Sequence, residues 1–373
     1  DPRLPWLQLA AISWIGDTVK SGLIKEFGSP EAVFRSSQSQ LSRVKGWTPA
    51  RLERFLREGK NTPPICNPET LDEKGIELVK FSDPEYPLLL RQIPDSPVVL
   101  FSMGKSIPDN RPHFSIVGAR QATQTGYDIA QEFSSALSKA GFVIVSGLAL
   151  GIDTFAHKGA LDAHGRTIAI LGCGSDVIYP SGNRKIREKI LENGELLSEY
   201  PPGMLARPWH FPVRNRIISG MSVGTLVIEA TARSGSLITA RLAGEQNRDV
   251  FALPGNIRSK LSQGTLALIN DGAELVTSPQ AIIDQYPHLI PEKEDSDLIA
   301  DFELTSDEAK LVETLSDDPV SLDKLLAQGK WSRDKLFNML LNLELRDILV
   351  KFPGNLFQAK IKSPSGRESH VKI

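Results

Sequence analysis

The residue types best suited to bind a phosphate group gather in one stretch, between residues 211 and 240. Two arginines with an asparagine between them come first, as Arg214, Asn215 and Arg216, and a Ser-Gly-Ser turn follows at 234–236. Guanidinium groups present forked donors that match phosphate oxygens. Unpaired amides at the start of a helix also attract anions. The stretch therefore predicts an anion site, with phosphate as the expected group.

The elements that must position this site can be read from the same stretch. An apolar run at 225–228 ends on Glu229, and a helical pattern begins at Leu237. A short apolar run bounded by turn signals is typical of a buried parallel strand. Between residues 114 and 279, predicted strands alternate with predicted helices, and most strands end in glycine or serine. The predicted strands are 114–117, 142–145, 167–171, 196–198, 225–229, 249–253 and 274–276, and a further strand is expected at 98–101. We therefore expect an α/β fold whose ligand lies at the carboxyl edge of a mostly parallel sheet.

Composition limits the classes of protein to consider. The chain has 373 residues, a hydrophobic fraction of 40% and a net charge of −2, which suit a soluble protein of two or three domains with any nucleic-acid site confined to a local groove. Cys66 and Cys173 stand far apart without a Cys/His cluster, so we expect neither disulfides nor a metal site. Membrane-span and signal-peptide patterns are lacking. The expectation is a cytoplasmic protein without cofactors or membrane contact.

The chain divides into segments with different patterns. The expected domains are a helical domain over 1–65 that resembles SAM or helix-hairpin-helix modules, a connector over 66–110, a Rossmann-like domain over 111–287, an acidic linker over 288–305, a winged-helix domain over 306–362 and a flexible tail over 363–373. The basic helix face of the first domain suits either DNA or a protein partner. The mixed charge of the winged helix leaves the same two alternatives open. Helix caps are predicted at Thr48, which precedes Pro49, and at Ser306, Ser321 and Ser332.

Ordered motifs over about 150 residues resemble those of the DprA/Smf family, the DNA-processing proteins of natural transformation. The matching stretches are IVGAR (116–120), SGLALGID (146–153), TIAILGCGSDVIYP (167–180), LSEYPPG (197–203), FPVRNRIISGMS (211–222), LVIEA (226–230), SGSLITA (234–240), RDVFALPG (248–255) and SQGTLALI (262–269). The resemblance implies an extended Rossmann fold, single-stranded DNA binding, a homodimer and loading of the recombinase RecA. Two departures are Ala119, where the family often has Ser, and Leu266, where it commonly has Asn.

Residue patterns and the resemblance together predict a DNA site without catalytic residues. The expected contacts are Gly118, Arg120, Gly147, Arg207, Phe211, Arg214, Asn215, Ser222, Ser234, Gly235, Ser236 and Thr239. Arginines and amides would hold phosphates and Phe211 would stack on a base, with Trp209 as a second aromatic candidate. The expected supporting residues are Arg216, Glu229 as an orienter of an arginine, and a hydrogen-bonded pair of Asp153 and His157, four residues apart on one helix face.

Two other functions fit parts of the same pattern. The stretch from Gly220 to Glu229 also resembles the phosphate-binding loop of lysine-decarboxylase-like enzymes that cleave nucleoside monophosphates, although Ser219-Gly220-Met221-Ser222 replaces their Pro-Gly-Gly turn. The second alternative is an interaction scaffold, in which the terminal domains bind partners and the central domain is only a core.

Overall fold

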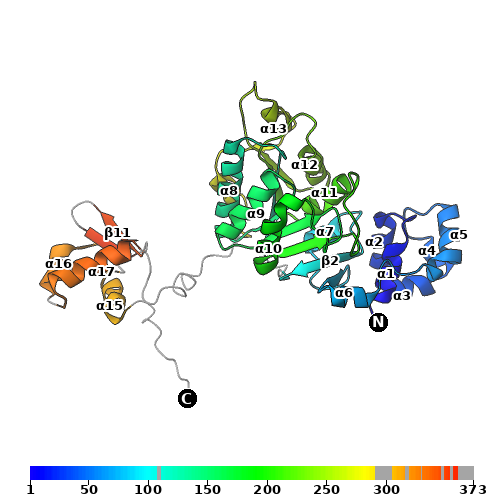
Figure 1. Ribbon diagram of the computed structural model, residues 1–373, viewed down its shortest axis with the longest axis horizontal. Coiled ribbons are helices and arrows are strands. Elements are labelled where there is room, and N and C mark those ends of the chain that lie inside the picture. Colours follow the sequence, from blue (N-terminus) through cyan, green and yellow to red (C-terminus); the bar gives the residue numbers. More distant parts are fainter. Residues whose placement is uncertain are drawn as a thin grey trace, which may run out of the picture. The chain divides into compact units, whose positions relative to one another are not determined.

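The computed structural model of the chain describes residues 1–106, 111–289, 305–315, 319–328, 330–345, 348–352 and 356–359 (Figure 1). The chain divides into two compact units, Asp1–Ile290 and Pro291–Ile373. Apart from residues 288, 289 and 305, the predicted acidic linker lies outside the described residues. The predicted tail, 363–373, lies outside them as well.

A nine-stranded sheet organises the first unit, in the order β1-β2-β6-β5-β4-β3-β7-β8-β9. Its parallel strands are β3 (His113–Val117), β4 (Val143–Ser146), β5 (Thr167–Leu171), β6 (Glu195–Ser198), β7 (Gly224–Val227), β8 (Asp249–Ala252) and β9 (Glu274–Leu275). Each overlaps a strand that the sequence predicts. The mostly parallel α/β class is therefore confirmed.

The segment 66–110, which the sequence predicts as a connector, supplies two further strands to this sheet. β1 (Glu77–Lys80) pairs antiparallel with β2 (Val99–Gly104), and β2 pairs antiparallel with β6. The apolar run 98–101 predicts a strand, and β2 confirms it. β1 was not predicted, because the prolines around it indicate turns, while strand pairing depends on residues distant in sequence.

Side chains alternate between the two faces of the sheet, and each face has its own helices. On β3, Phe114 and Ile116 belong to one core cluster, whereas Val117 belongs to another. The first face packs against α8 (Gln124–Lys139), α9 (Ile152–Asp162), α10 (Arg184–Asn193) and α14 (Pro279–Ile283). The second packs against α7 (Leu88–Gln92), α11 (His210–Gly220) and α12 (Ser236–Glu245), while α13 (Gln263–Asn270) lies against β8. Within the described parts of the chain, no helix has the length and apolarity needed to cross a membrane.

The N-terminal helices belong to the core cluster on the second face of the sheet, the cluster that contains Val117. They are α1 (Leu4–Ala11), α2 (Asp17–Phe27), α3 (Pro30–Arg35), α4 (Gln38–Leu41), α5 (Pro49–Glu58) and α6 (Pro68–Glu73). As the sequence predicts, Thr48 caps α5, accepting a hydrogen bond from the Arg51 amide at 3.3 Å, and Pro49 opens the helix. Of the basic residues on α5, Arg54 and Arg57 both pair with Glu58.

A buried arginine on α11 connects these helices to the sheet. Arg216 is 5% exposed and forms ion pairs with Asp17 of α2 at 2.8 Å, Glu199 after β6 at 2.7 Å and Asp95 at 3.3 Å. Burial alone would lower its pKa, but the three carboxylates together hold the pKa of Arg216 above its ordinary value. The cluster joins segments that lie far apart in sequence.

The second unit contains a small three-stranded sheet in the order β10-β12-β11. Its elements are α15 (Ser306–Thr314), β10 (Val320–Ser321), α16 (Leu322–Ala327), α17 (Arg333–Leu345), β11 (Leu349–Phe352) and β12 (Leu356–Ala359). Ser321 and Ser332 cap α16 and α17, as predicted. The predicted cap of α15 was wrong by one residue, because Thr305 and Glu308 form the capping box and Ser306 begins the helix.

Replacing Arg216 with Ala is expected to destabilise the first unit strongly, by about 3–5 kcal/mol, because it leaves three partly buried carboxylates without their cation. Urea unfolding followed by circular dichroism measures this loss. The matched control is Arg241→Ala, which breaks the exposed Arg241–Glu245 pair on α12 and should change stability by less than about 1 kcal/mol. Equal effects of the two substitutions would contradict the structural role of Arg216.

Two buried histidines connect stability to pH. His113 Nδ1 donates to the Met221 carbonyl at 3.3 Å, and His157 Nδ1 lies 2.7 Å from Thr167 Oγ1. Neither Nε2 atom has a hydrogen-bond partner among the described residues. Burial lowers the pKa of His113 to about 4 and, with the nearby charge of Arg214, that of His157 to about 3. Both side chains are therefore neutral in the folded protein at pH 5.

Below pH about 6.5, the unfolded chain binds protons at these histidines that the folded chain does not bind. Their contribution to stability is complete above that pH and falls as the pH drops towards 4. Between pH 7 and pH 5 we expect a loss of about 2 kcal/mol for each histidine. His157→Gln should remove about half of this pH dependence in urea unfolding. A His157→Gln profile that matches the wild type would refute the assignment.

Candidate functional site

A cavity of about 580 Å³ lies at the carboxyl edge of the sheet in the first unit. Loops after three neighbouring strands form its walls: the loop after β3, the loop after β4 and the loop after β7, closed by the first turns of α11 and α12. β3 lies between β4 and β7. The strands β4, β5 and β6 therefore extend the sheet on one side of β3, and the strands β7, β8 and β9 extend it on the other. Such a switch point leaves a crevice between the loops, and ligands of α/β sheets bind there. We call this space the main cavity.

The cavity brings together most of the residues that the sequence predicts. Those among its lining residues are Gly118, Arg120, Phe211, Arg214, Asn215, Ser234, Gly235, Ser236, Thr239 and Asp153. Gly147 lines a smaller pocket beside it. Residues from five separate segments of the sequence therefore share one site, and the loops of the sheet hold them there.

Two glycines of the site are required by close packing. A Cβ atom on Gly147 would lie 2.5 Å from Arg214 Nη2, and one on Gly118 would lie 2.6 Å from the Ile152 side chain. Gly235 differs, because a Cβ atom there would meet nothing within 4 Å. The first two glycines shape the walls of the cavity, whereas Gly235 keeps the start of α12 open to solvent.

Arg214 is the buried charge of the site. It is 3% exposed, and its Nη1 donates to the carbonyl of Gly147 at 2.8 Å and to that of Ile170. Its Nε has no partner among the described residues. Burial lowers the pKa of Arg214 to about 10, and the negative charge of Asp153 opposes this shift. Arg214 therefore remains charged at neutral pH and joins the ends of β4 and β5.

The other polar residues of α11 and α12 hold the opposite wall. Asn215 Nδ2 donates to the Gly235 carbonyl at 3.4 Å, which connects α11 to the turn before α12. Ser234 Oγ lies 2.8 Å from Ser236 Oγ and accepts from the Ser236 amide at 3.4 Å. Thr239, one turn later, is 1% exposed at the base of the cavity. Hydroxyls and amides at this helix start suit an anion.

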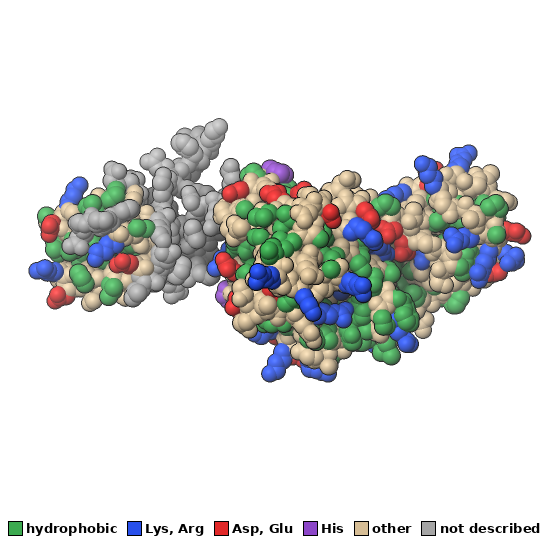
Figure 2. Space-filling view, turned by 90° about the horizontal axis from the view of Figure 1, so that it is seen from above, with side chains coloured by type: hydrophobic (Ala, Val, Ile, Leu, Met, Phe, Trp, Pro, Cys, Tyr) green, Lys and Arg blue, Asp and Glu red, His purple; other side chains and the backbone are tan. Residues whose placement is uncertain are grey.

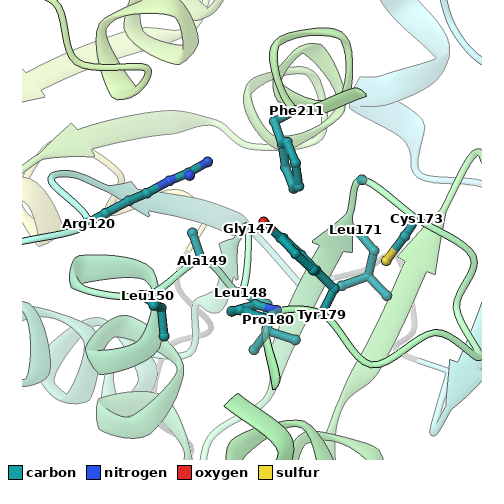
Figure 3. A pocket seen from close by; sticks show the side chains of 11 residues that line it. Arg120, Gly147, Leu148, Ala149, Leu150, Leu171, Cys173, Tyr179, Pro180 and Phe211 are labelled. Atoms are coloured by element: carbon teal, nitrogen blue, oxygen red, sulfur yellow. The ribbon is translucent and has the colours of Figure 1, made fainter. Parts of the chain in front are cut away.

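Arg120 and Phe211 stand between the main cavity and a side pocket of about 60 Å³. Figure 3 shows the two side chains reaching into the same space, Arg120 from the loop after β3 and Phe211 from the start of α11. The Arg120 guanidinium lies 5.5 Å from the Phe211 ring centre and has no ion pair or hydrogen bond among the described residues. The Tyr179 ring centre lies 5.5 Å from that of Phe211. The pocket thus combines an exposed cation with two aromatic rings.

Tyr179 and Leu150 also line this pocket, and the sequence patterns did not indicate either as a site residue. Both residues fall inside motifs that carry the family resemblance, so those motifs could have indicated them as site residues. Tyr179 is the last residue but one of the stretch 167–180. It follows β5 by eight residues and carries no phosphate-binding group. Only the fold shows that its ring returns to the ends of the strands.

Two of the predicted DNA-binding residues line neither the main cavity nor the side pocket. Ser222 is buried after α11, at the opposite end of β7, and donates to the Ile218 carbonyl at 2.9 Å. It was assigned wrongly because residues that precede a strand lie at its amino edge. Arg207 is exposed and lines neither cavity, although its guanidinium lies 6.0 Å from the Trp209 ring.

For three supporting residues, the partners in the structure differ from the predicted ones. Asp153 accepts from the amides of Gly147 at 3.2 Å and Ala149 at 3.3 Å, so it supports the loop after β4 and forms no hydrogen bond with His157. Glu229 accepts from the Thr123 amide at 2.8 Å and from its hydroxyl at 2.7 Å. It therefore stabilises the start of α8 instead of orienting an arginine. Among the described residues, no group of His, Cys, Asp and Glu side chains could hold a metal ion.

Comparisons with known proteins agree with this architecture. A family model described as DNA recombination-mediator protein A matches residues 77–287, and a DprA winged helix domain model matches residues 300–355. Protein Smf from Synechocystis is 39% identical over 284 residues, which cover 74% of this chain and 71% of that protein. The X-ray structure of DprA from Streptococcus pneumoniae is similar at a TM-score of 0.64 with 34% identity, covering 74% of this chain and 95% of that one.

A further solved structure, of DNA processing protein A from Helicobacter pylori, concerns the single-stranded DNA binding mode of that protein. It is similar at a TM-score of 0.52 with 29% identity, and covers 58% of this chain and 99% of that one. The family model alone spans more than half of this sequence, and its residues carry the sheet and the main cavity. The chain therefore belongs to the DprA/Smf family of DNA processing proteins, with a C-terminal winged-helix domain.

Proposed function

We propose that this protein binds single-stranded DNA at the main cavity and the side pocket, without catalysing a reaction on it. The observation that carries the proposal is the position of Arg120. Its guanidinium is exposed, lacks an acidic partner among the described residues and borders both an amide-lined cavity and an aromatic pocket. Single-strand binding combines these two features, because cations bind the backbone and aromatic rings stack on bases.

The side pocket favours stacking over the reading of a particular base. Backbone carbonyls around it already accept hydrogen bonds: that of Leu148 from Asn183 Nδ2 at 2.9 Å, and that of Gly172 from His210 Nδ1 at 3.0 Å. The carbonyl of Cys173, likewise, accepts from Ser198 Oγ at 2.6 Å. We therefore expect weak sequence selectivity and strong salt dependence. Duplex DNA should bind less well because its bases are paired and stacked.

Family membership supports the same proposal, since the solved structure of the Helicobacter pylori relative concerns the single-stranded DNA binding mode of that protein. On the family resemblance alone, we further propose that the chain acts in natural transformation as a cytoplasmic homodimer. In that role it would protect incoming strands and load RecA onto them. A dimer would place two cavities on one strand and raise the overall affinity.

The alternative of a nucleotide-cleaving enzyme has less support. The glutamate that would act in such a site is Glu229, and both of its carboxylate oxygens are bound by Thr123. Glu229 is also absent from the residues that line the main cavity. In this structure the carboxylate has a capping role at α8.

Arg120→Ala is expected to weaken binding of a labelled oligothymidylate by about tenfold, the loss typical of one charge-assisted contact. It should also reduce the slope of log affinity against log salt by about 0.7, because one phosphate contact disappears. Fluorescence anisotropy over a salt series measures both quantities. The control is Lys139→Ala, which removes an exposed cation from the C-terminal end of α8, away from the cavity. Unchanged affinity and slope for Arg120→Ala would exclude Arg120 from the site.

Phe211→Leu should behave differently, because it removes an aromatic face and no charge. We expect a loss of affinity of about fivefold or more, in the range of one base stack, with an unchanged salt slope. The same anisotropy series measures it. Phe211→Tyr, which keeps the ring, is the matched control and should retain most of the affinity. A change of salt slope in Phe211→Leu would show that the substitution disturbs Arg120 instead of a stacking contact.

A further inference from the structure

The loop before α11 exposes a tryptophan that the packing of the protein does not explain. Trp209 is 64% exposed, whereas Trp6 is buried and Trp14, Trp47 and Trp331 are at least partly buried. Tryptophan is usually well buried, so an exposed ring suggests a contact with another molecule. Other large apolar side chains of the same stretch are exposed as well, namely Met204, Leu205 and Val213. Figure 2 shows one face of the first unit, on which Lys and Arg side chains lie beside exposed hydrophobic groups.

Hydrogen bonds and ring contacts fix the residues around Trp209, although its own ring is exposed. His210, the next residue, stacks on Tyr200 with ring centres 4.1 Å apart and donates to the Gly172 carbonyl at 3.0 Å. Earlier in the loop, the Met204 carbonyl accepts from the Gly174 amide at 2.8 Å. Gly172 lines the side pocket, so the same contacts fix both the pocket and the loop. An ordered exposed ring costs little conformational entropy when it binds a ligand.

A cation accompanies this ring. The Arg207 guanidinium lies 6.0 Å from the Trp209 ring centre and has no acidic partner among the described residues. Phe211, whose ring faces the side pocket, follows Trp209 by two residues, so the two rings leave the start of α11 in different directions. Trp209 is the residue before α11 and Phe211 is the second residue of that helix, so a DNA strand bound at Phe211 lies within reach of Trp209.

We propose that Trp209 and Arg207 form a second stacking station for the same DNA strand, in which Trp209 stacks on an unpaired base next to the pocket and Arg207 binds its phosphate. The inference rests on the proposed function, and it adds a position that Phe211 and Arg120 do not provide. Aromatic rings interleaved with arginines are the arrangement that binds successive nucleotides of single strands. A second copy of this chain is the competing occupant of the exposed apolar side chains.

Oligothymidylates of two and twelve nucleotides distinguish the station from the pocket. In the wild-type chain, lengthening the strand should increase the affinity and quench tryptophan fluorescence, because the longer strand reaches Trp209. Trp209→Ala should lose about fivefold or more in affinity for the twelve-nucleotide strand, the effect of one base stack. Trp209→Phe should keep most of that affinity. The matched control is Val213→Ala, an exposed apolar residue one turn later on α11, which should bind as the wild type does.

Three results would contradict the proposal that Trp209 and Arg207 bind the DNA strand. They are an unchanged affinity of Trp209→Ala for the longer strand, an equal loss in Val213→Ala, and a change of the molar mass in light scattering that accounts for the lost affinity. The last result would assign the surface to a second copy of the chain. Failure of the proposed function itself is recognised separately, because the wild-type protein would then bind neither oligonucleotide.

Discussion

The site depends on a buried positive charge that the protein keeps between the ends of its central strands. Arg214 donates to carbonyl groups at the ends of β4 and β5, and the glycine at position 147 is required because the guanidinium lies where a side chain would start. Burial of a charge is costly unless hydrogen bonds and opposite charges compensate for it. Asp153 supplies the opposite charge and also binds the amides of the loop after β4. The shape of that loop and the charge of Arg214 are therefore maintained together.

Helix α11 distributes three neighbouring polar residues among three tasks. Arg214 faces the sheet, Asn215 reaches the turn before α12 and Arg216 pairs with acids from the N-terminal part of the chain. Neighbouring residues of a helix point about 100° apart, so one short segment can hold three surfaces at once. The exposed cation next to Phe211 is then Arg120, which comes from the loop after β3. Arg214 and Arg216 therefore stabilise the site, whereas Arg120 is the arginine placed to contact a ligand.

The sequence predicted the regular elements well because their signals are local. Apolar runs between turn residues marked all the parallel strands, and Thr48, Ser321 and Ser332 were identified as helix caps from their neighbours. Signals that depend on distant partners were missed. The antiparallel strand β1 was not predicted, because it depends on its pairing with β2, beyond a stretch rich in prolines. Ser222 has the residue type of a phosphate ligand, yet it lies at the wrong end of its strand.

By itself, the sequence determined that this is an α/β protein with a glycine-rich, arginine-bearing edge, and its motifs indicated the family. These properties follow from residue type, spacing and periodicity, which are written along the chain. The tertiary structure decided which arginine is buried and which is exposed, that Tyr179 faces Phe211, and that Glu229 belongs to the start of α8. Burial and partnership are properties of the packed whole, because the order of strands in the sheet brings together loops that the sequence keeps far apart.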